Sequence, residues 1–325
     1  MRKKVLLLSA LLLWEASPLG AAMQKASFLP QWSPQAQFAG YYVAYEKGLY
    51  RKNGIDLTIL QGGSNQPPHD YLEGRKADFV SAWLAAAIQK RSQGVKLVNI
   101  GQVVQRSALM LVAKKSSNIR TPRDMQGKKV GLWEGDFQIQ PKAFFKKYNL
   151  RVNVIPQSFS VNLFLRGGVD VASAMWYNEY HTILNAGINP DELSTFFFHE
   201  SGLNFPEDGI YTLETTFRQN PSLATAFVRA SLEGWQYAFA HPDEALTIVL
   251  AYISRARIPA NRMHQKWMLA RMKDIISPPN RAAPPGVLQP SDYARVAHEL
   301  RESGLINKIP DYHSFFVRWD SHAEK

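Results

Sequence analysis

Two stretches of this chain share one pattern: RKADFVSAW at residues 75–83 and GGVDVASAMW at residues 167–176. Each runs from a basic or glycine lead through an aspartate and small, apolar residues to a tryptophan. A short apolar run of this kind is typical of a strand buried in a parallel sheet. Chance is the alternative for so short a match. We interpret the repeat as two similar α/β lobes, each with a tryptophan at the carboxyl end of an equivalent strand.

Short apolar strands alternate with helical patterns over the first two thirds of the chain, which predicts parallel α/β units. Residues 36–54 predict one helix that ends at Gly48 or Gly54. Thr121 and Asp124 have the spacing of a capping box at a helix start. The expected strands are 25–32, 55–60, 77–82, 96–104, 106–115, 128–133, 151–156, 169–175, 194–199 and 209–214, and the later helices are 220–240, 243–254, 260–275 and 290–303.

Charge and cysteine content exclude several classes of protein. The chain has a net charge of +11 and no cysteine. Its lysines and arginines are scattered rather than clustered, so we expect a basic surface and no nucleic-acid partner. The lack of cysteine excludes disulfides, thiol chemistry and cysteine-ligated zinc. A chain of roughly 300 residues without disulfides depends on its hydrophobic core, which at this length we expect to be divided between two domains.

The first residues have the order of a secretory signal peptide. Basic residues at positions 2–4 precede an apolar run from Val5 to Trp14, and the small-residue stretch SPLGAAM follows. About ten apolar residues are too few to span a bilayer, and this order is typical of an export signal. We expect residues 1–22 to be a signal peptide cleaved near Ala22. The mature protein is then expected to be soluble and periplasmic.

The segment AMWYNEYHTIL, residues 174–184, changes from a small-residue strand to aromatic and polar residues. Ligands of open parallel sheets bind outside the carboxyl ends of the strands, so two facing lobes would offer Trp83 and Trp176 to one cleft. Asn178 and Glu179 can read the edge of a planar ligand, although the start of an exposed helix is the alternative. Further stacking faces are expected from Tyr177, Trp32, Trp133 and one of the adjacent tyrosines, Tyr42; for the tryptophans, core packing is the alternative.

Three segments, in chain order, resemble a known family: QWSPQAQFAGYYVAYEKGLYRKNGIDLTI at 31–59, GQVVQRSALMLVAKKSSNIRTPRDMQGKKVGLW at 101–133 and MWYNEYHTILNAG at 175–187. They resemble the thiamine-pyrimidine-precursor family of periplasmic binding proteins, the substrate-binding subunits of ABC importers for hydroxymethyl- or formylamino-pyrimidines. The resemblance implies a type II periplasmic-binding fold of two α/β lobes, each a mostly parallel sheet flanked by helices, with a helical C-terminal extension. Lobe I would comprise 23–108 and 206–325, lobe II 109–205, and the two crossings would form a hinge.

The resemblance also implies binding residues by position: Trp32, Gln102, Gln105, Arg106, Ser107, Tyr177, Asn178 and Glu179. For residues 105–107, a purely structural role in the hinge is the alternative. There are two departures. Pyrimidine-binding relatives tend to carry Asp before the tryptophan and His before Ala-Gly, where this chain has Gln31 and Phe38. The loss of two polar partners favours a flatter or less polar ligand. The loop QGGSNQ at 61–66 offers backbone amides to an anion, but it lacks a phosphate-binding fingerprint.

We therefore predict a monomeric solute-binding protein that captures a small heteroaromatic ligand by hinge closure and delivers it to the membrane permease of an ABC importer. No catalytic residue, metal or cofactor is expected, because the eight histidines are dispersed and no HExxH or GxSxG pattern occurs. A riboflavin- or sulfonate-binding relative and an extracellular sensor are the alternatives. Yeast relatives that synthesise the thiamine pyrimidine are associated with a cysteine-rich segment, which this chain lacks.

Overall fold

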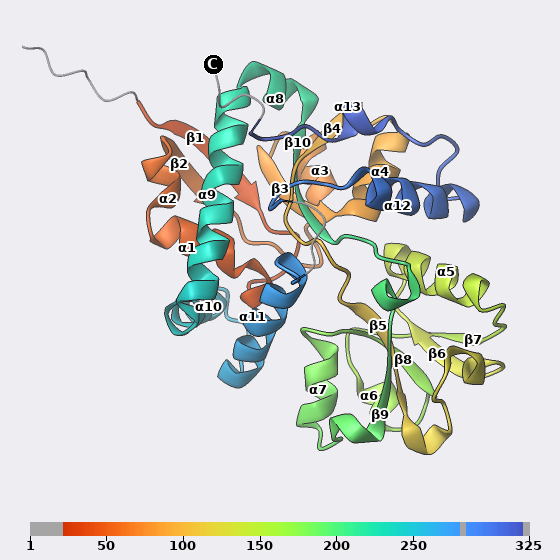
Figure 1. Ribbon diagram of the computed structural model, residues 1–325. Helices are drawn as coiled ribbons and strands as arrows, with labels where there is room; N and C mark the ends of the chain where they lie inside the picture. Colours follow the sequence, from red (N-terminus) through yellow and green to blue (C-terminus); the bar gives the residue numbers. More distant parts are fainter. Residues whose placement is uncertain (1–21, 280–283, 321–325) are drawn as a thin grey trace, which may run out of the picture.

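The protein is described by a computed structural model that covers residues 22–279 and 284–320. Two five-stranded sheets with flanking helices form its two halves (Figure 1). This arrangement confirms the predicted α/β class. The expected signal peptide lies outside the described residues, apart from Ala22. Within the two described ranges, no helix is long and apolar enough to cross a bilayer.

The first sheet is built mainly from the N-terminal third of the chain. Its strand order is β2 (Ile55–Ile59), β1 (Gln24–Leu29), β3 (Phe79–Trp83), β10 (Asp208–Leu213) and β4 (Leu97–Gln102). Strand β1 pairs in parallel with β2 and β3. The continuous apolar run of β3 is explained by burial on both faces of the sheet. Its helices are α1 (Ala39–Glu46), α2 (Leu49–Lys52), α3 (Pro68–Glu73) and α4 (Leu84–Ser92).

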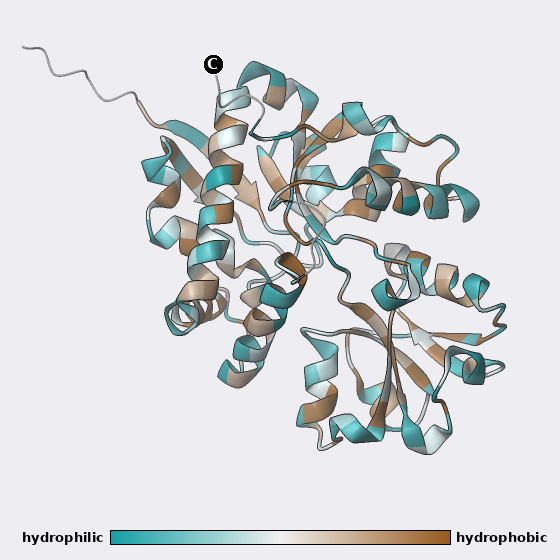
Figure 2. Cartoon of the chain, viewed as in Figure 1, coloured by the Kyte–Doolittle hydropathy of each residue, from teal (hydrophilic) through white to brown (hydrophobic). Residues whose placement is uncertain are grey.

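The second sheet repeats this plan with the middle of the chain. Its strand order is β7 (Asn153–Pro156), β6 (Lys129–Leu132), β8 (Val171–Met175), β5 (Leu109–Lys114) and β9 (Leu193–Phe197). All five residues of β8 are buried, as are the first four of the equivalent strand β3. Figure 2 shows these strands as largely apolar, with hydrophilic residues on the outer turns of the helices. Those helices are α5 (Ile139–Lys147), α6 (Asn162–Leu165) and α7 (Glu179–Asn185).

One strand in each sheet is antiparallel, which strand prediction alone did not indicate. The chain crosses between the sheets after β4 and again after β9. Each crossing enters the next sheet at the edge where the parallel strands end. Leu109 at the start of β5 therefore pairs with Met175 at the end of β8, and Asp208 at the start of β10 pairs with Trp83. The crossings thus bring their own side chains to the carboxyl ends of the strands.

The C-terminal helices pack beside the first sheet. The long helix α9 crosses α1 closely, because a Cβ at Gly234 would lie 2.2 Å from the backbone oxygen of Gly40. Trp235, the next residue of α9, is almost fully buried at this crossing. The remaining elements follow the expected helical tail: α8 (Glu214–Gln219), α9 (Pro221–Ala240), α10 (Pro242–Arg255), α11 (Arg262–Ile276), α12 (Pro290–Glu302) and α13 (Tyr312–Phe315).

Of two local features predicted from the sequence, the structure confirms the capping box and divides the helix. Thr121 and Asp124 form the predicted capping box, at the start of the 3-10 turn Pro122–Met125. The single helix expected over 36–54 is instead divided into the 3-10 turn Ala36–Phe38, α1 and α2. The break falls at Gly48, whose φ of 69° is left-handed and interrupts the helix.

Candidate ligand-binding site

A cavity of about 600 Å³ lies where the carboxyl ends of strands from both sheets meet. This volume is within the range of pockets that bind small molecules. Its wall includes residues that end or follow β1, β3, β6 and β8, as the sheet topology requires. Six of the predicted site residues line it: Trp32, Trp83, Trp133, Tyr177, Asn178 and Glu179.

Aromatic side chains form much of the wall and meet across it. The ring of Trp32 contacts that of Phe159 with centroids 5.0 Å apart, and Trp83 contacts Phe137 at 4.7 Å. Trp133 also contacts Phe137, at 5.5 Å, and its indole nitrogen donates to a backbone oxygen. The Trp32–Phe159 and Trp83–Phe137 pairs join the first half to the second, and the tryptophans offer faces on which a planar ligand can stack. Phe137 and Phe159 were not predicted, because isolated phenylalanines in loops carry no recognisable signal.

Glu179 is the principal polar group on the second-sheet side of the cavity. It follows the buried strand β8, and its carboxyl accepts hydrogen bonds from the backbone N–H of Met175 at 3.0 Å and from Nδ2 of Asn178 at 2.8 Å. Burial raises the pKa of Glu179 to about 7. Near neutral pH this carboxyl can therefore either accept hydrogen bonds from a ligand's amino group or donate one to a ring nitrogen.

On the first-sheet side, two glutamines and a buried aspartate form a second polar group. Asp208 accepts hydrogen bonds from Nε2 of Gln37, at 2.9 Å, and from Nε2 of Gln31. Both glutamines line the cavity. Burial raises the pKa of Asp208 to about 7, and the two amides oppose that rise. In the sequence, Gln31 stands out only as a departure from the family pattern, and the return crossing brings Asp208 to the site.

The residues of the two crossings hold the backbone rather than line the cavity. Nε2 of Gln105 donates to the backbone oxygen of Gln102 at 2.6 Å. Oγ of Ser107 donates to Gln140 at 3.1 Å and to Glu207 at 3.3 Å. Glu207 also accepts from the backbone N–H of Ala108 at 2.6 Å, and burial raises its pKa to about 8. The structure thus places Gln105 and Ser107 in the crossings, outside the cavity wall.

Two predicted aromatic residues also lie elsewhere. Tyr42 stacks on Tyr252 of α10, with ring centroids 4.1 Å apart, because α1 turns that side chain toward the C-terminal helices. Trp176 contacts Phe197 and has the guanidinium of Arg271 over its ring at 4.7 Å. Trp176 is thus not the partner of Trp83 in the cleft. That role belongs to the next residue, Tyr177, since successive side chains leave a strand end in opposite directions.

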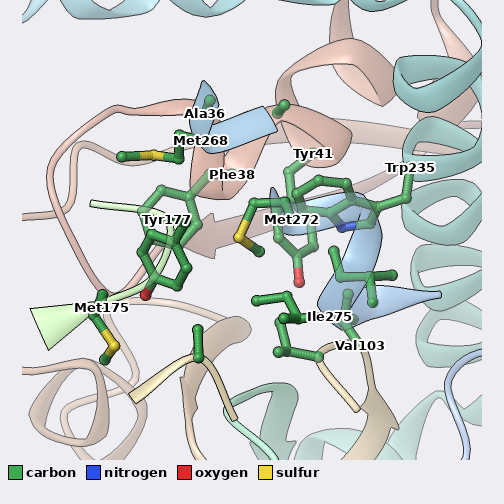
Figure 3. Packing of buried hydrophobic residues seen from close by; sticks show 14 of the residues in the cluster. Ala36, Phe38, Tyr41, Val103, Met175, Tyr177, Trp235, Met268, Met272 and Ile275 are labelled. Atoms are coloured by element: carbon green, nitrogen blue, oxygen red, sulfur yellow. The ribbon is translucent and has the colours of Figure 1, made fainter. Parts of the chain in front are cut away.

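Tyr177 lines the cavity and also belongs to a buried cluster. Figure 3 shows its ring in the same cluster as Phe38, Met268 and Met175. Phe38 is fully buried and does not line the cavity. Phe38, at the position where relatives tend to carry His, therefore adds packing to the core. It exposes no apolar surface to a ligand, so its presence does not argue for a less polar ligand.

A set of contacts between α7 and α11 also joins the two halves; we call it the α7–α11 latch (Figure 1). Nε2 of His264 lies 2.8 Å from Oδ1 of Asn178, and Nδ1 of His264 lies 3.0 Å from Nδ1 of His181. The indole nitrogen of Trp267 donates to the backbone oxygen of Trp176 at 3.0 Å. Helix α11 packs against the first half of the molecule, so the latch joins the two halves beside the cavity.

The described residues contain no cluster of metal-binding side chains. Within 22–279 and 284–320, no three His, Cys, Asp or Glu side chains converge as a metal ion would need.

Comparison with known proteins identifies relatives over most of the chain. Residues 35–245, well over half of the sequence, match the family described as NMT1/THI5 like. The riboflavin-binding protein RibY of Chloroflexus aurantiacus is 26% identical over 249 residues, which cover 73% of this chain and 68% of that protein. The formylaminopyrimidine-binding protein of Halalkalibacterium halodurans is 21% identical, with 80% of each chain covered. A 4-amino-5-hydroxymethyl-2-methylpyrimidine phosphate synthase of Legionella pneumophila is 23% identical, covering 74% of this chain and 78% of that protein.

The fold is also known from solved structures. The periplasmic aliphatic sulphonate binding protein SsuA from Escherichia coli matches with a TM-score of 0.70 and 14% identity, over 91% of this chain and 93% of that one. At this identity the likeness shows the fold, which is that of the type II periplasmic binding proteins.

Proposed function

The chain belongs to the NMT1/THI5-like family, and we propose that it is the solute-binding protein of an ABC importer, capturing a small planar heteroaromatic ligand. In this proposal residues 23–108 and 206–325 form lobe I and residues 109–205 form lobe II. The crossings after β4 and β9 act as the hinge. Support comes from the division of the strands between the two sheets, and from the position of the cavity between them.

The observation that carries the proposal is the pairing of aromatic faces with Glu179 in one cavity. Trp32, Trp83 and Trp133 provide the faces, and the carboxyl of Glu179 lies in the same wall beside Asn178. A planar heteroaromatic ligand with an amino group matches both features. Glu179 keeps its hydrogen bonds from Met175 and Asn178 in either case, so the amino group adds a charge-assisted hydrogen bond that analogues lacking it cannot make.

The charge of the cavity argues against a sulfonate. A sulfonate is anionic, yet the only cationic side chain in the described wall is Lys90. Lys90 lies 4.0 Å from Asp70 and 3.9 Å from Glu73, so its charge is already balanced. The carboxyls of Glu179 and Asp208 would further repel an anion. Among the ligands of the relatives, an aminopyrimidine or a flavin therefore fits better.

The same proposal includes a cellular location and a protein partner. We propose that the mature protein is periplasmic and monomeric, and that it docks on a membrane permease, as the family resemblance and the predicted signal peptide imply. We assign it no catalytic role. The relatives that are synthases share the family, but the cysteine-rich segment associated with their chemistry has no counterpart in a chain without cysteine.

The first experiment is native mass spectrometry of the mature protein, purified gently and measured before and after denaturation. Binding is then measured by calorimetry with 4-amino-5-hydroxymethyl-2-methylpyrimidine, riboflavin and an alkanesulfonate. We expect a heteroaromatic ligand to bind, and Glu179→Gln to weaken that binding roughly tenfold or more, since hydrogen bonds to charged groups are the stronger ones. Glu200→Gln, on an exposed residue of the second half, is the matched control. Binding of the sulfonate alone would show the ligand class to be wrong.

A further inference from the structure

Asn178 does not make the local hydrogen bond that its position in the chain offers. It is the N-cap residue of α7, where an asparagine side chain ordinarily accepts a hydrogen bond from a backbone N–H of the first turn, and here it makes none. Its Nδ2 instead donates to Oε1 of Glu179 at 2.8 Å, and its Oδ1 lies 2.8 Å from Nε2 of His264. The amide therefore links the cavity wall to α11.

The chemistry of these groups fixes the direction of each hydrogen bond. An ionised carboxyl only accepts, so the amide of Asn178 turns its nitrogen to Glu179 and its oxygen to His264. Burial lowers the pKa of His264, so its imidazole is neutral near pH 7 and carries the proton on Nε2. Nδ1 of His264 is then an acceptor, and Nδ1 of His181 donates to it. The result is a directed chain of hydrogen bonds that ends at Glu179.

His264 is held in place by the first half of the molecule. It lies in the first turn of α11, where its backbone N–H donates to the side chain of the N-cap residue Asn261 at 3.0 Å. The side chain of the next residue, Gln265, is buried and accepts a hydrogen bond from the backbone N–H of Ala36 at 2.8 Å. Asn178, in contrast, belongs to the second half. The contact between His264 and Asn178 therefore forms only while the two halves lie together.

The hydrogen bond from Asn178 influences how Glu179 meets a ligand. Burial raises the pKa of Glu179 to about 7, and hydrogen bonds from backbone N–H groups and from Asn178 oppose that rise. An ionised Glu179 accepts a hydrogen bond from a ligand's amino group, whereas a protonated one donates to a ring nitrogen. A donor beside a carboxyl favours its ionised form, so an amide fixed with its nitrogen toward Glu179 favours the accepting state.

We propose that His264 is a specificity-determining residue: it fixes the amide of Asn178 and thereby holds Glu179 as a hydrogen-bond acceptor for the ligand's amino group. His264 lies outside the cavity wall, so it is a positioning residue that acts through Asn178. Because the first half carries His264, the amino group is fully recognised only when the two halves have closed. This inference rests on the proposed function, in which Glu179 binds the amino group.

The test measures the preference for the amino group by calorimetry near pH 7 on the mature protein. The probes are 4-amino-5-hydroxymethyl-2-methylpyrimidine and the same compound without its amino group. We expect the wild type to bind the amino compound roughly tenfold or more tightly, since the additional hydrogen bond is charge-assisted. In His264→Ala that preference should fall to within about threefold. A role in closure alone would instead weaken the binding of both compounds by the same factor.

Two further variants separate the positioning role from the rest of the α7–α11 latch. His264→Gln keeps an N–H donor at the position of Nε2 but lacks the ring nitrogen that contacts His181, and it should retain the preference. His181→Ala removes the other histidine and leaves the contact between His264 and Asn178 in place. It should weaken the binding of both compounds by the same factor, so that the preference is again retained. Melting curves report whether each variant folds.

The other outcomes overturn distinguishable claims. An unchanged preference in His264→Ala would reject the positioning role and leave the proposed function standing. An equal loss of preference in His181→Ala would assign the effect to closure rather than to the contact with Asn178. Failure of His264→Gln to retain the preference would show that a donor at this position is not the cause. If the wild type binds neither compound, or both equally, Glu179 does not recognise an amino group, and the proposed ligand and the inference are both wrong.

Discussion

Replacing His264 with alanine is expected to weaken ligand binding by up to roughly 30-fold while leaving each half of the protein folded. The side chain bridges the two halves through Asn178 at 2.8 Å and His181 at 3.0 Å. A net contribution of about 1 kcal/mol for each hydrogen bond gives about 2 kcal/mol for the pair. Since about 1.4 kcal/mol corresponds to a factor of ten, the closed form loses roughly 30-fold in population relative to the open form.

The assay is calorimetry with the ligand found by native mass spectrometry, together with small-angle scattering of the ligand-free protein. Opening of the α7–α11 latch should raise the radius of gyration of His264→Ala and lower its apparent affinity. His313→Ala is the control, because His313 is exposed and lies outside the latch. An affinity within twofold of wild type, at an unchanged radius of gyration, would refute the assignment of the latch to closure.

The latch also predicts a pH dependence with a definite sign. Burial lowers the pKa of both His181 and His264 below 6.5, and for His264 the neighbouring His181 lowers it further. A lowered pKa means that the latch is fully formed above pH 6.5 and is lost as the pH falls through the lowered values. Arg271 of α11 and Glu179 of α7 are the nearby charged groups, and both remain in the variant. Acidification from pH 7 to 5 should therefore weaken ligand binding more in wild type than in His264→Ala.

Three further variants test the crossings, the helix packing and the stacking wall. Burial raises the pKa of Glu207 from 4.5 to about 8, so its contribution to stability is greatest at acid pH and declines as the pH rises between those values. Glu207→Gln should therefore reduce the fall in melting temperature between pH 5 and pH 8. An unchanged dependence of the melting temperature on pH would contradict this. Gly234→Ala places a Cβ 2.2 Å from the backbone oxygen of Gly40 and should lower the free energy of unfolding in urea by about 1–3 kcal/mol. An unaltered unfolding midpoint would show that α1 moves away without cost. Trp83→Ala should weaken ligand binding roughly tenfold or more by calorimetry, whereas Tyr42→Ala should lower stability and spare affinity; the reverse pattern would place the wrong ring in the cavity.

Local pattern was sufficient to predict the elements that carry the site. Strands β3 and β8 are buried on both faces, so their sequences are continuous apolar runs that can be recognised without a structure. Trp83, the last residue of β3, and Trp133, directly after β6, lie in the cavity because the carboxyl ends of parallel strands share one edge. The Tyr-Asn-Glu segment was also predicted from its resemblance and its strand-end position, and Glu179 lines the cavity.

What the sequence by itself determined is thus the order of strands and helices and the polar or aromatic character of each strand end. The tertiary structure alone decided which of these side chains meet. Tyr177 rather than Trp176 faces the cavity, since the direction of a side chain depends on where the pairing of β8 ends. Asp208 reaches the site because the chain returns through the second crossing and pairs with the end of β3. Such approaches are set by long-range packing between segments distant in sequence, on which local periodicity carries no information.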